Sequence, residues 1–95
     1  MVAYAIVRII DISDADEFEV YKSKAGPTLA SHDAKVIVGG GRKVTLEGDD
    51  DTAVVIIEFP SYEAAQAWYD SPEYVAAMKH RLGASRAQVV IAEGR

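Results

Sequence analysis

Long apolar runs rich in β-branched residues mark the strands of this chain. The clearest runs cover Val2–Ile10, Thr52–Phe59 and Ala87–Ala92, and each has the length of a single strand. A shorter run over Ala34–Val38 predicts a further strand, which three consecutive glycines follow. Lys43–Leu46 predicts either a short extra strand or a continuation of the previous one beyond a glycine bulge. The pattern indicates four strands, of which the second is either whole or broken.

A first helix is expected after the first strand, from about Asp14. Asp14 and Glu17 have the spacing of a capping box, which satisfies free amide groups of a first helical turn. The apolar residues that recur at helical spacing on one face are Ala15, Phe18, Tyr21, Ala25 and Leu29. Pro27 lacks an amide hydrogen and should kink this helix or end it near Lys24.

A second, aromatic-rich helix is expected after the third strand, with one interruption. Ser61 is placed to cap its first turn. Ser71 and Pro72 break the helix and restart it, because serine is a good cap and proline suits a first helical position. The apolar and aromatic residues along both pieces are Tyr62, Ala65, Trp68, Tyr69, Val75, Met78 and Leu82. Gly83 suits the C-terminal cap.

The order of these elements predicts one α+β domain over residues 1–95. A strand–helix–strand–strand–helix–strand order is that of a ferredoxin-like βαββαβ fold, with a mainly antiparallel sheet. Right-handed crossovers place both helices on the same face of such a sheet. The strands are nearly continuous apolar runs, which is typical of sheets covered on both faces. Since one face lacks a cover from its own chain, we expect a homodimer that packs sheet to sheet.

Alternation along the strands assigns residues to the two faces of the sheet. On the first strand, Ala3 and its alternate neighbours suit close helix packing, whereas Arg8 points to the opposite face. Glu58 shares that face on the neighbouring strand, so an Arg8–Glu58 contact is predicted at the dimer interface. Two interpretations stay open: a structural ion pair, or a catalytic pair in which Arg8 holds a carboxylate ligand and Glu58 acts as general base.

Composition narrows the partners and the compartment. The net charge of −5 repels phosphate backbones and argues against nucleic-acid binding. The chain has no cysteine, which excludes disulfides and thiolate metal sites and fits a reducing compartment. The N-terminal apolar run has neither a basic leader nor the length of a membrane span. We therefore expect a cytoplasmic protein.

The segment from Leu46 to Arg81 carries the features of a known family. Its marks are Glu58-Phe59-Pro60-Ser61, Ala67-Trp68-Tyr69, Ser71-Pro72-Glu73-Tyr74 and Arg81, with Tyr21, Pro27 and Gly39-Gly40-Gly41 before them. On these residues the chain resembles the family catalogued as domain of unknown function 1330. Ser31-His32-Asp33 departs from the glycine-bearing turn expected before the second strand.

The resemblance implies a dimeric α/β barrel and no assigned function. The wider superfamily is similar to cofactor-free monooxygenases, haem-degrading enzymes, chlorite dismutases and lactone isomerases. A shared fold does not determine function. From the resemblance, a cofactor-independent oxygenase-like or isomerase-like role is one expectation, and we expect no bound cofactor.

Several side chains are candidates for a ligand site. Tyr21 and Tyr74 carry hydroxyls that need partners if they are buried, although aromatic residues at helical spacing more often form a core. Arg81 lies about two helical turns beyond Tyr74 and could bind an anionic ligand, although a solvated arginine is the favoured interpretation. His32 is a further candidate ligand-binding residue, because histidine can act as a base near neutral pH, although a surface or hydrogen-bonded histidine without such a role is the favoured interpretation. If the chain has a pocket, we expect a small organic ligand, with an anionic one as a candidate.

Other polar groups favour structural interpretations. His32 and His80 lie far apart without metal-ligand spacing, and no metal site is expected. Gly39-Gly40-Gly41 lacks the lysine of a phosphate loop and indicates a turn or bulge. Asp49-Asp50-Asp51 favours a solvated hairpin turn over a cation site.

Two function classes remain open. One is an enzyme or binder with a small-molecule pocket between the sheet and the helices. The other is a non-catalytic dimeric module whose interior polar groups are structural. A cavity of several hundred Å³ would favour the first class.

Overall fold

The computed structural model describes all 95 residues and confirms the predicted element order. The strands are β1 (Ala3–Ile12), β2 (Lys35–Gly39), β3 (Ala53–Phe59) and β4 (Ser85–Glu93). The helices are α1 (Ala15–Ala25), α2 (Tyr62–Asp70) and α3 (Pro72–Ala84). Two short 3-10 turns, η1 (Gly26–Thr28) and η2 (Ala30–His32), follow α1.

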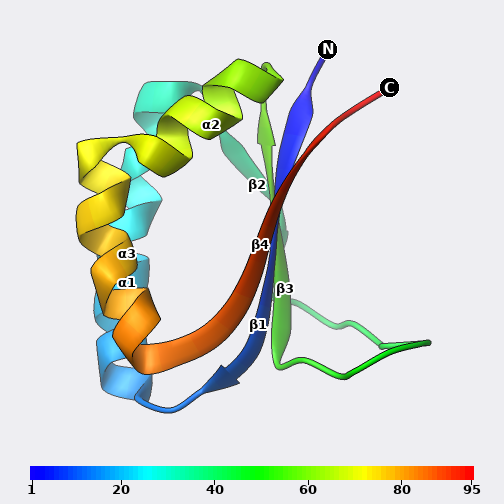
Figure 1. Cartoon of the computed structure of the whole chain (residues 1–95), viewed down its shortest axis with the longest axis vertical. Coiled ribbons are helices and arrows are strands. Elements are labelled where there is room, and N and C mark those ends of the chain that lie inside the picture. Colours follow the sequence, from blue (N-terminus) through cyan, green and yellow to red (C-terminus); the bar gives the residue numbers. More distant parts are fainter.

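The four strands form an antiparallel sheet in the order β2-β3-β1-β4. All three helices lie on one side of this sheet, and its other face is bare (Figure 1). This order and this layering confirm the ferredoxin-like α+β fold. None of the helices is both long enough and apolar enough to cross a membrane.

Side-chain alternation along β1 separates the two faces as predicted. Ala3, Ala5, Val7 and Ile9 are buried under the helices, and the residues between them are half-buried. The small alanines allow α2 to lie close to the sheet, where Ala65 is also fully buried. We refer to the helix-covered side as the inner face and to the bare side as the outer face.

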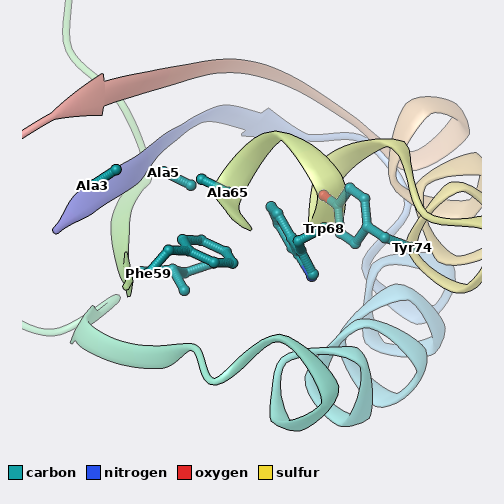
Figure 2. Packing of buried hydrophobic residues seen from close by; sticks show 7 residues of the cluster. Ala3, Ala5, Phe59, Ala65, Trp68 and Tyr74 are labelled. Carbon is teal, nitrogen blue, oxygen red and sulfur yellow. The ribbon is translucent and has the colours of Figure 1, made fainter. Parts of the chain in front are cut away.

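The core lies between the inner face and α2, where three aromatic side chains stack (Figure 2). The Trp68 ring centroid lies 5.3 Å from that of Phe59 on β3 and 4.0 Å from that of Tyr74 on α3. These are the largest fully buried side chains of the chain. Their burial attaches both helices to the sheet through the hydrophobic effect.

Helix caps occur where the sequence predicts them. The Asp14 side chain accepts from the amide of Glu17, and the Ser61 hydroxyl accepts from that of Ala64. Ser71 caps α3 by accepting from the amide of Tyr74, and its hydroxyl also donates to the carbonyl of Trp68 at 2.7 Å. One buried serine thus ends α2 and starts α3.

Three local predictions need correction or refinement. Lys43–Leu46 is not a strand, because residues 40–52 leave the sheet and form a long projection between β2 and β3, here called the arm (Figure 1). Gly83 is not a cap, since α3 continues to Ala84 and Ser85 then starts β4 in an extended conformation. At the departure noted before β2, Asp33 adopts a left-handed conformation with φ of 53°, which a short polar residue tolerates in place of glycine.

The base of the arm is held by one carboxylate, which corrects the prediction of a solvated turn. The Asp51 side chain is only 2% exposed, although it lies near the surface and away from the hydrophobic core. Lys43 Nζ lies 2.6 Å from its Oδ1, and Arg8 Nε donates to its Oδ2 at 2.7 Å. These contacts from Lys43 and then Arg8 lower the pKa of Asp51 below its ordinary value of 3.8.

Replacing Ser71 by alanine should cost about 1–2 kcal/mol of unfolding free energy, because the change removes one cap bond and one bond to a carbonyl. Urea unfolding followed by tryptophan fluorescence measures this loss. Ser61→Ala is the matched control, since the Ser61 hydroxyl makes only the cap bond. A smaller loss for Ser71→Ala than for Ser61→Ala would contradict the double role.

Acid should weaken the fold partly through Asp51. Because its folded pKa lies below the unfolded value, its stabilising effect is present above the ordinary pKa of 3.8 and is lost as pH falls through the lower folded pKa. Asp51→Asn should therefore lose stability at neutral pH and show a shallower decline between about pH 5 and pH 2 than the wild type. Unfolding midpoints measured across this range give both slopes, with exposed Asp70→Asn as control. If the stability of Asp51→Asn declines with pH as steeply as that of the wild type, Asp51 does not contribute to the acid sensitivity.

Candidate functional site

A cavity of about 370 Å³ opens between α1 and the inner face of the sheet. It exists because α1 packs mainly against α3 and buries none of its own residues against the strands. Twelve of its 17 lining residues are hydrophobic, so the cavity is suited to an apolar molecule. Val7, Val55 and Ile57 line it from the sheet; Phe18, Tyr21 and Leu29 line it from the helical side.

Trp68 forms a wall of the cavity and has a fixed orientation. Its indole Nε1 donates to the Thr28 hydroxyl at 2.9 Å, and this hydroxyl donates to the carbonyl of Ala25 at 2.6 Å. Thr28 lies in η1, immediately after Pro27 ends α1. The proline-terminated helix end thus supplies the partner that a buried indole N–H requires.

Three of the predicted ligand-binding residues meet beside the cavity. The hydroxyls of Tyr21 on α1 and Tyr74 on α3 are hydrogen-bonded at 2.9 Å. The Arg81 guanidinium carbon lies 5.8 Å from the centroid of the Tyr21 ring. Burial, together with the neighbouring Tyr74, raises the pKa of Tyr21, so this hydroxyl stays protonated at neutral pH and can either donate to Tyr74 or accept from it.

Arg81 is charged although it is nearly out of contact with water. The residue is 4% exposed, its buried Nε has no hydrogen-bond partner, and no carboxylate pairs with it. Burial acts to lower the pKa of Arg81, but the phenol groups of Tyr74 and Tyr21 outweigh it and the pKa is raised. A fixed positive charge therefore lies directly behind the Tyr21 ring.

Arg8 and Glu58 share the outer face as predicted, but the contact predicted between them is wrong. The β1–β3 register places Arg8 opposite Val54 and Glu58 opposite Tyr4, four residues apart along the strand. Arg8 bonds to Asp51 instead, and Glu58 lies 3.3 Å from Lys35 Nζ. Neither side chain lines the cavity, which lies on the inner face.

The two histidines occupy separate places. His32 is half-buried at the end of η2 and does not line the cavity. His80 Nδ1 contacts the carboxylate of Glu17, which connects α3 to α1. No three His, Asp or Glu side chains converge where they could hold a metal ion.

Thr28 and Asp51 are the important polar residues that sequence reasoning missed. Nothing in the sequence around Thr28 signals a partner for Trp68, because the two lie 40 residues apart. Asp51 did carry a signal. It lies just before β3, which runs antiparallel to β1, so it had to lie near the end of β1 that follows Arg8.

Solved structures with this fold come from several organisms. A protein of unknown function from Rhodopseudomonas palustris is 21% identical, with a TM-score of 0.77 over 98% of this chain and 82% of that one. A dimeric ferredoxin-like protein of unknown function from Jannaschia sp. CCS1 is 13% identical, with a TM-score of 0.75 over 99% of this chain and 100% of that one.

A third neighbour is an enzyme. SnoaB, a cofactor-independent oxygenase from Streptomyces nogalater, is 14% identical, with a TM-score of 0.59 over 99% of this chain and 92% of that one. At such identities the likeness establishes the fold and not the activity. Among curated proteins no match is found.

The whole sequence, in contrast, fits one family. The match runs over residues 2–95 and takes in the cavity, the tyrosine pair and Arg81. It agrees with the resemblance drawn from the Glu58–Ser61 and Ser71–Tyr74 segments. The chain belongs to the family described as domain of unknown function DUF1330.

Proposed function

We propose that this protein is a homodimer that binds a small, largely apolar organic molecule in the cavity between α1 and the sheet. The observation that carries the proposal is the cavity itself. Its volume of about 370 Å³ lies within the range of known ligand pockets, about 300–1,000 Å³. A small domain has little apolar surface to spare, so an open cavity within the helix–sheet layer is costly unless something occupies it.

The lining supports an apolar ligand with a flat or branched body. Phe18, Tyr21 and Trp68 offer aromatic surfaces, and Val55 and Ile57 offer aliphatic ones. The Trp68 N–H is already bonded to Thr28, so the ligand meets the ring of this residue rather than its polar atom. Binding of such a molecule would be driven by removal of apolar surface from water.

Two forms of this proposal differ in chemistry. The enzymatic form is cofactor-independent oxygenation or isomerisation of the bound molecule, supported by the fold shared with SnoaB. The non-catalytic form is a binding module. Mass spectrometry of a ligand recovered after aerobic incubation separates them, because a new product supports the enzyme and unchanged ligand supports the module.

The outer face supports association with a second copy. One apolar row crosses all four strands in register, from Val38 through Ile56 and Ile6 to Val90. Val90 is 56% exposed in the single chain. A continuous apolar row of this kind is typical of an interface, and a two-fold axis lets each copy cover the other. The Jannaschia neighbour, described as dimeric, is consistent with this arrangement.

The arm supports the same partner. Leu46 on the arm is 86% exposed, whereas the base of the arm is held firmly at Asp51. A projection that is anchored at its base and exposes Val44 and Leu46 suits packing against a neighbouring subunit. Arg8 and Glu58 belong to this outer face, so the catalytic roles predicted for them would require a site between the two protomers.

The remaining predictions stay untested. His32 keeps its predicted ligand-binding role only if a ligand extends beyond the cavity towards η2. A cytoplasmic location and the absence of nucleic-acid partners are expectations from composition, supported by the lack of cysteine and by the acidic charge.

Filling the cavity should abolish binding without unfolding the protein. Val55→Phe places a larger side chain in the cavity lining, and we expect at least about a tenfold loss of affinity for neutral probes such as cyclohexanol and 1-octanol. Trp68 is the only tryptophan and lines the cavity, so its emission reports binding directly. Ala67→Phe on the exposed side of α2 is the control. Equal affinities for both variants would refute the cavity as the site.

A charge in the middle of the outer row should separate the protomers. We expect the wild type to show about twice the chain mass of 10.3 kDa in light scattering at micromolar concentration. Ile56→Lys should give the single-chain mass, because a lysine buried between two copies would lose its hydration. Ala76→Lys, on the exposed side of α3, should leave the dimer intact. A monomeric wild type would end the dimer proposal.

A further inference from the structure

Arg81 is the least compensated charge in the chain. Its guanidinium is almost fully buried, one of its nitrogens has no partner, and its neighbours are the phenol groups of Tyr21 and Tyr74 rather than carboxylates. Its position in the last turn of α3 supplies only a modest favourable field. A buried charge without a counter-ion is strongly unfavourable in a fold of this size. Such a cost is typical of residues kept for binding rather than for stability.

Tyr21 connects this charge to the cavity. Its ring lines the cavity, and the same ring lies against the Arg81 guanidinium. Its hydroxyl is hydrogen-bonded to that of Tyr74 and lies close to Arg81. Tyr21 is half-buried at the edge of the core and α1 has no fully buried residue, so a shift of this ring disturbs the core less than a shift of the fully buried Trp68 or Tyr74 would. A shift of this ring would open the guanidinium to the cavity.

The other charges at the cavity do not serve this purpose. Glu19 and Lys22 line its edge on α1, but they pair with each other at 3.1 Å and both are largely exposed. Water already screens them, so they discriminate poorly between a charged and a neutral ligand. Arg81 acts in a dry environment, where a bidentate bond to a carboxylate is strong and geometrically specific.

We propose that the cavity binds organic acids and that Arg81 recognises their carboxylate group. This inference rests on the proposed function of the cavity and defines the class of its ligand. The apolar body of the acid fills the cavity between Val55 and Trp68. The carboxylate takes the place of the Tyr21 hydroxyl, pairs with Arg81, and accepts a second hydrogen bond from the hydroxyl of Tyr74.

Matched acids and amides test the inference on the wild-type protein. Cyclohexylacetate is compared with cyclohexylacetamide, and octanoate with octanamide, at neutral pH. These aliphatic probes do not absorb where Trp68 is excited, so its emission reports occupancy alone. We expect each acid to bind at least about tenfold more tightly than its amide, because a charge-assisted bond forms only with the acid.

Arg81→Met identifies the residue responsible. The variant keeps the apolar stem, so we expect it to fold with an unchanged or higher melting temperature, to bind the amides as the wild type does, and to lose the preference for acids. Arg86→Met, on the exposed part of β4, removes the same net charge and should keep the preference.

The outcomes are distinct. Equal binding of acids and amides by the wild type would overturn the inference and leave the cavity proposal standing. Failure of all four probes to bind would overturn both. If Arg81→Met still prefers acids, another side chain causes the preference, and the role of Arg81 is overturned. If Arg81→Met does not fold, the preference must disappear in Arg81→Gln, or the role is again overturned.

Discussion

The packing of Trp68 is the interaction on which the other features of this fold depend. Its ring contacts Phe59 on the sheet and Tyr74 on α3, and its N–H bonds to Thr28 after α1. This side chain of α2 therefore joins the sheet to α3 and to the turn that follows α1. The same ring marks the edge of the core. On its far side α1 does not pack closely on the strands, and the space between them is the cavity.

The two faces of the sheet differ in what they pack against, because alternate residues of each strand point to opposite faces. The inner positions of β1 are small or aliphatic and allow α2 to approach, so the core forms at one end and the cavity at the other. The outer positions form an apolar row that no segment of the chain covers. All three helices lie on the inner face, so no helix remains to cover the outer face, and association is the simplest remedy.

Two arginines illustrate how context decides the role of a charge. Arg8 lies on the outer face, yet its guanidinium is committed to Asp51 and to the carbonyl of Asp49, so it stabilises the base of the arm. Arg81 is more deeply buried and has only phenols beside it. The first charge is paired within the chain, whereas the second has no counter-ion there.

The sequence by itself determined the element order, the ferredoxin-like fold, the caps at Asp14, Ser61 and Ser71, and the face on which the residues of β1 and β3 lie. These features depend on local periodicity and on hydrogen bonds between residues close in sequence. Strand register, the bond between Trp68 and Thr28, the meeting of Tyr21 with Arg81, and the cavity were decided only by tertiary structure. They depend on distances between elements far apart in the chain, which no local pattern encodes. For this reason Arg8 and Glu58 were correctly assigned to one face and wrongly expected to touch.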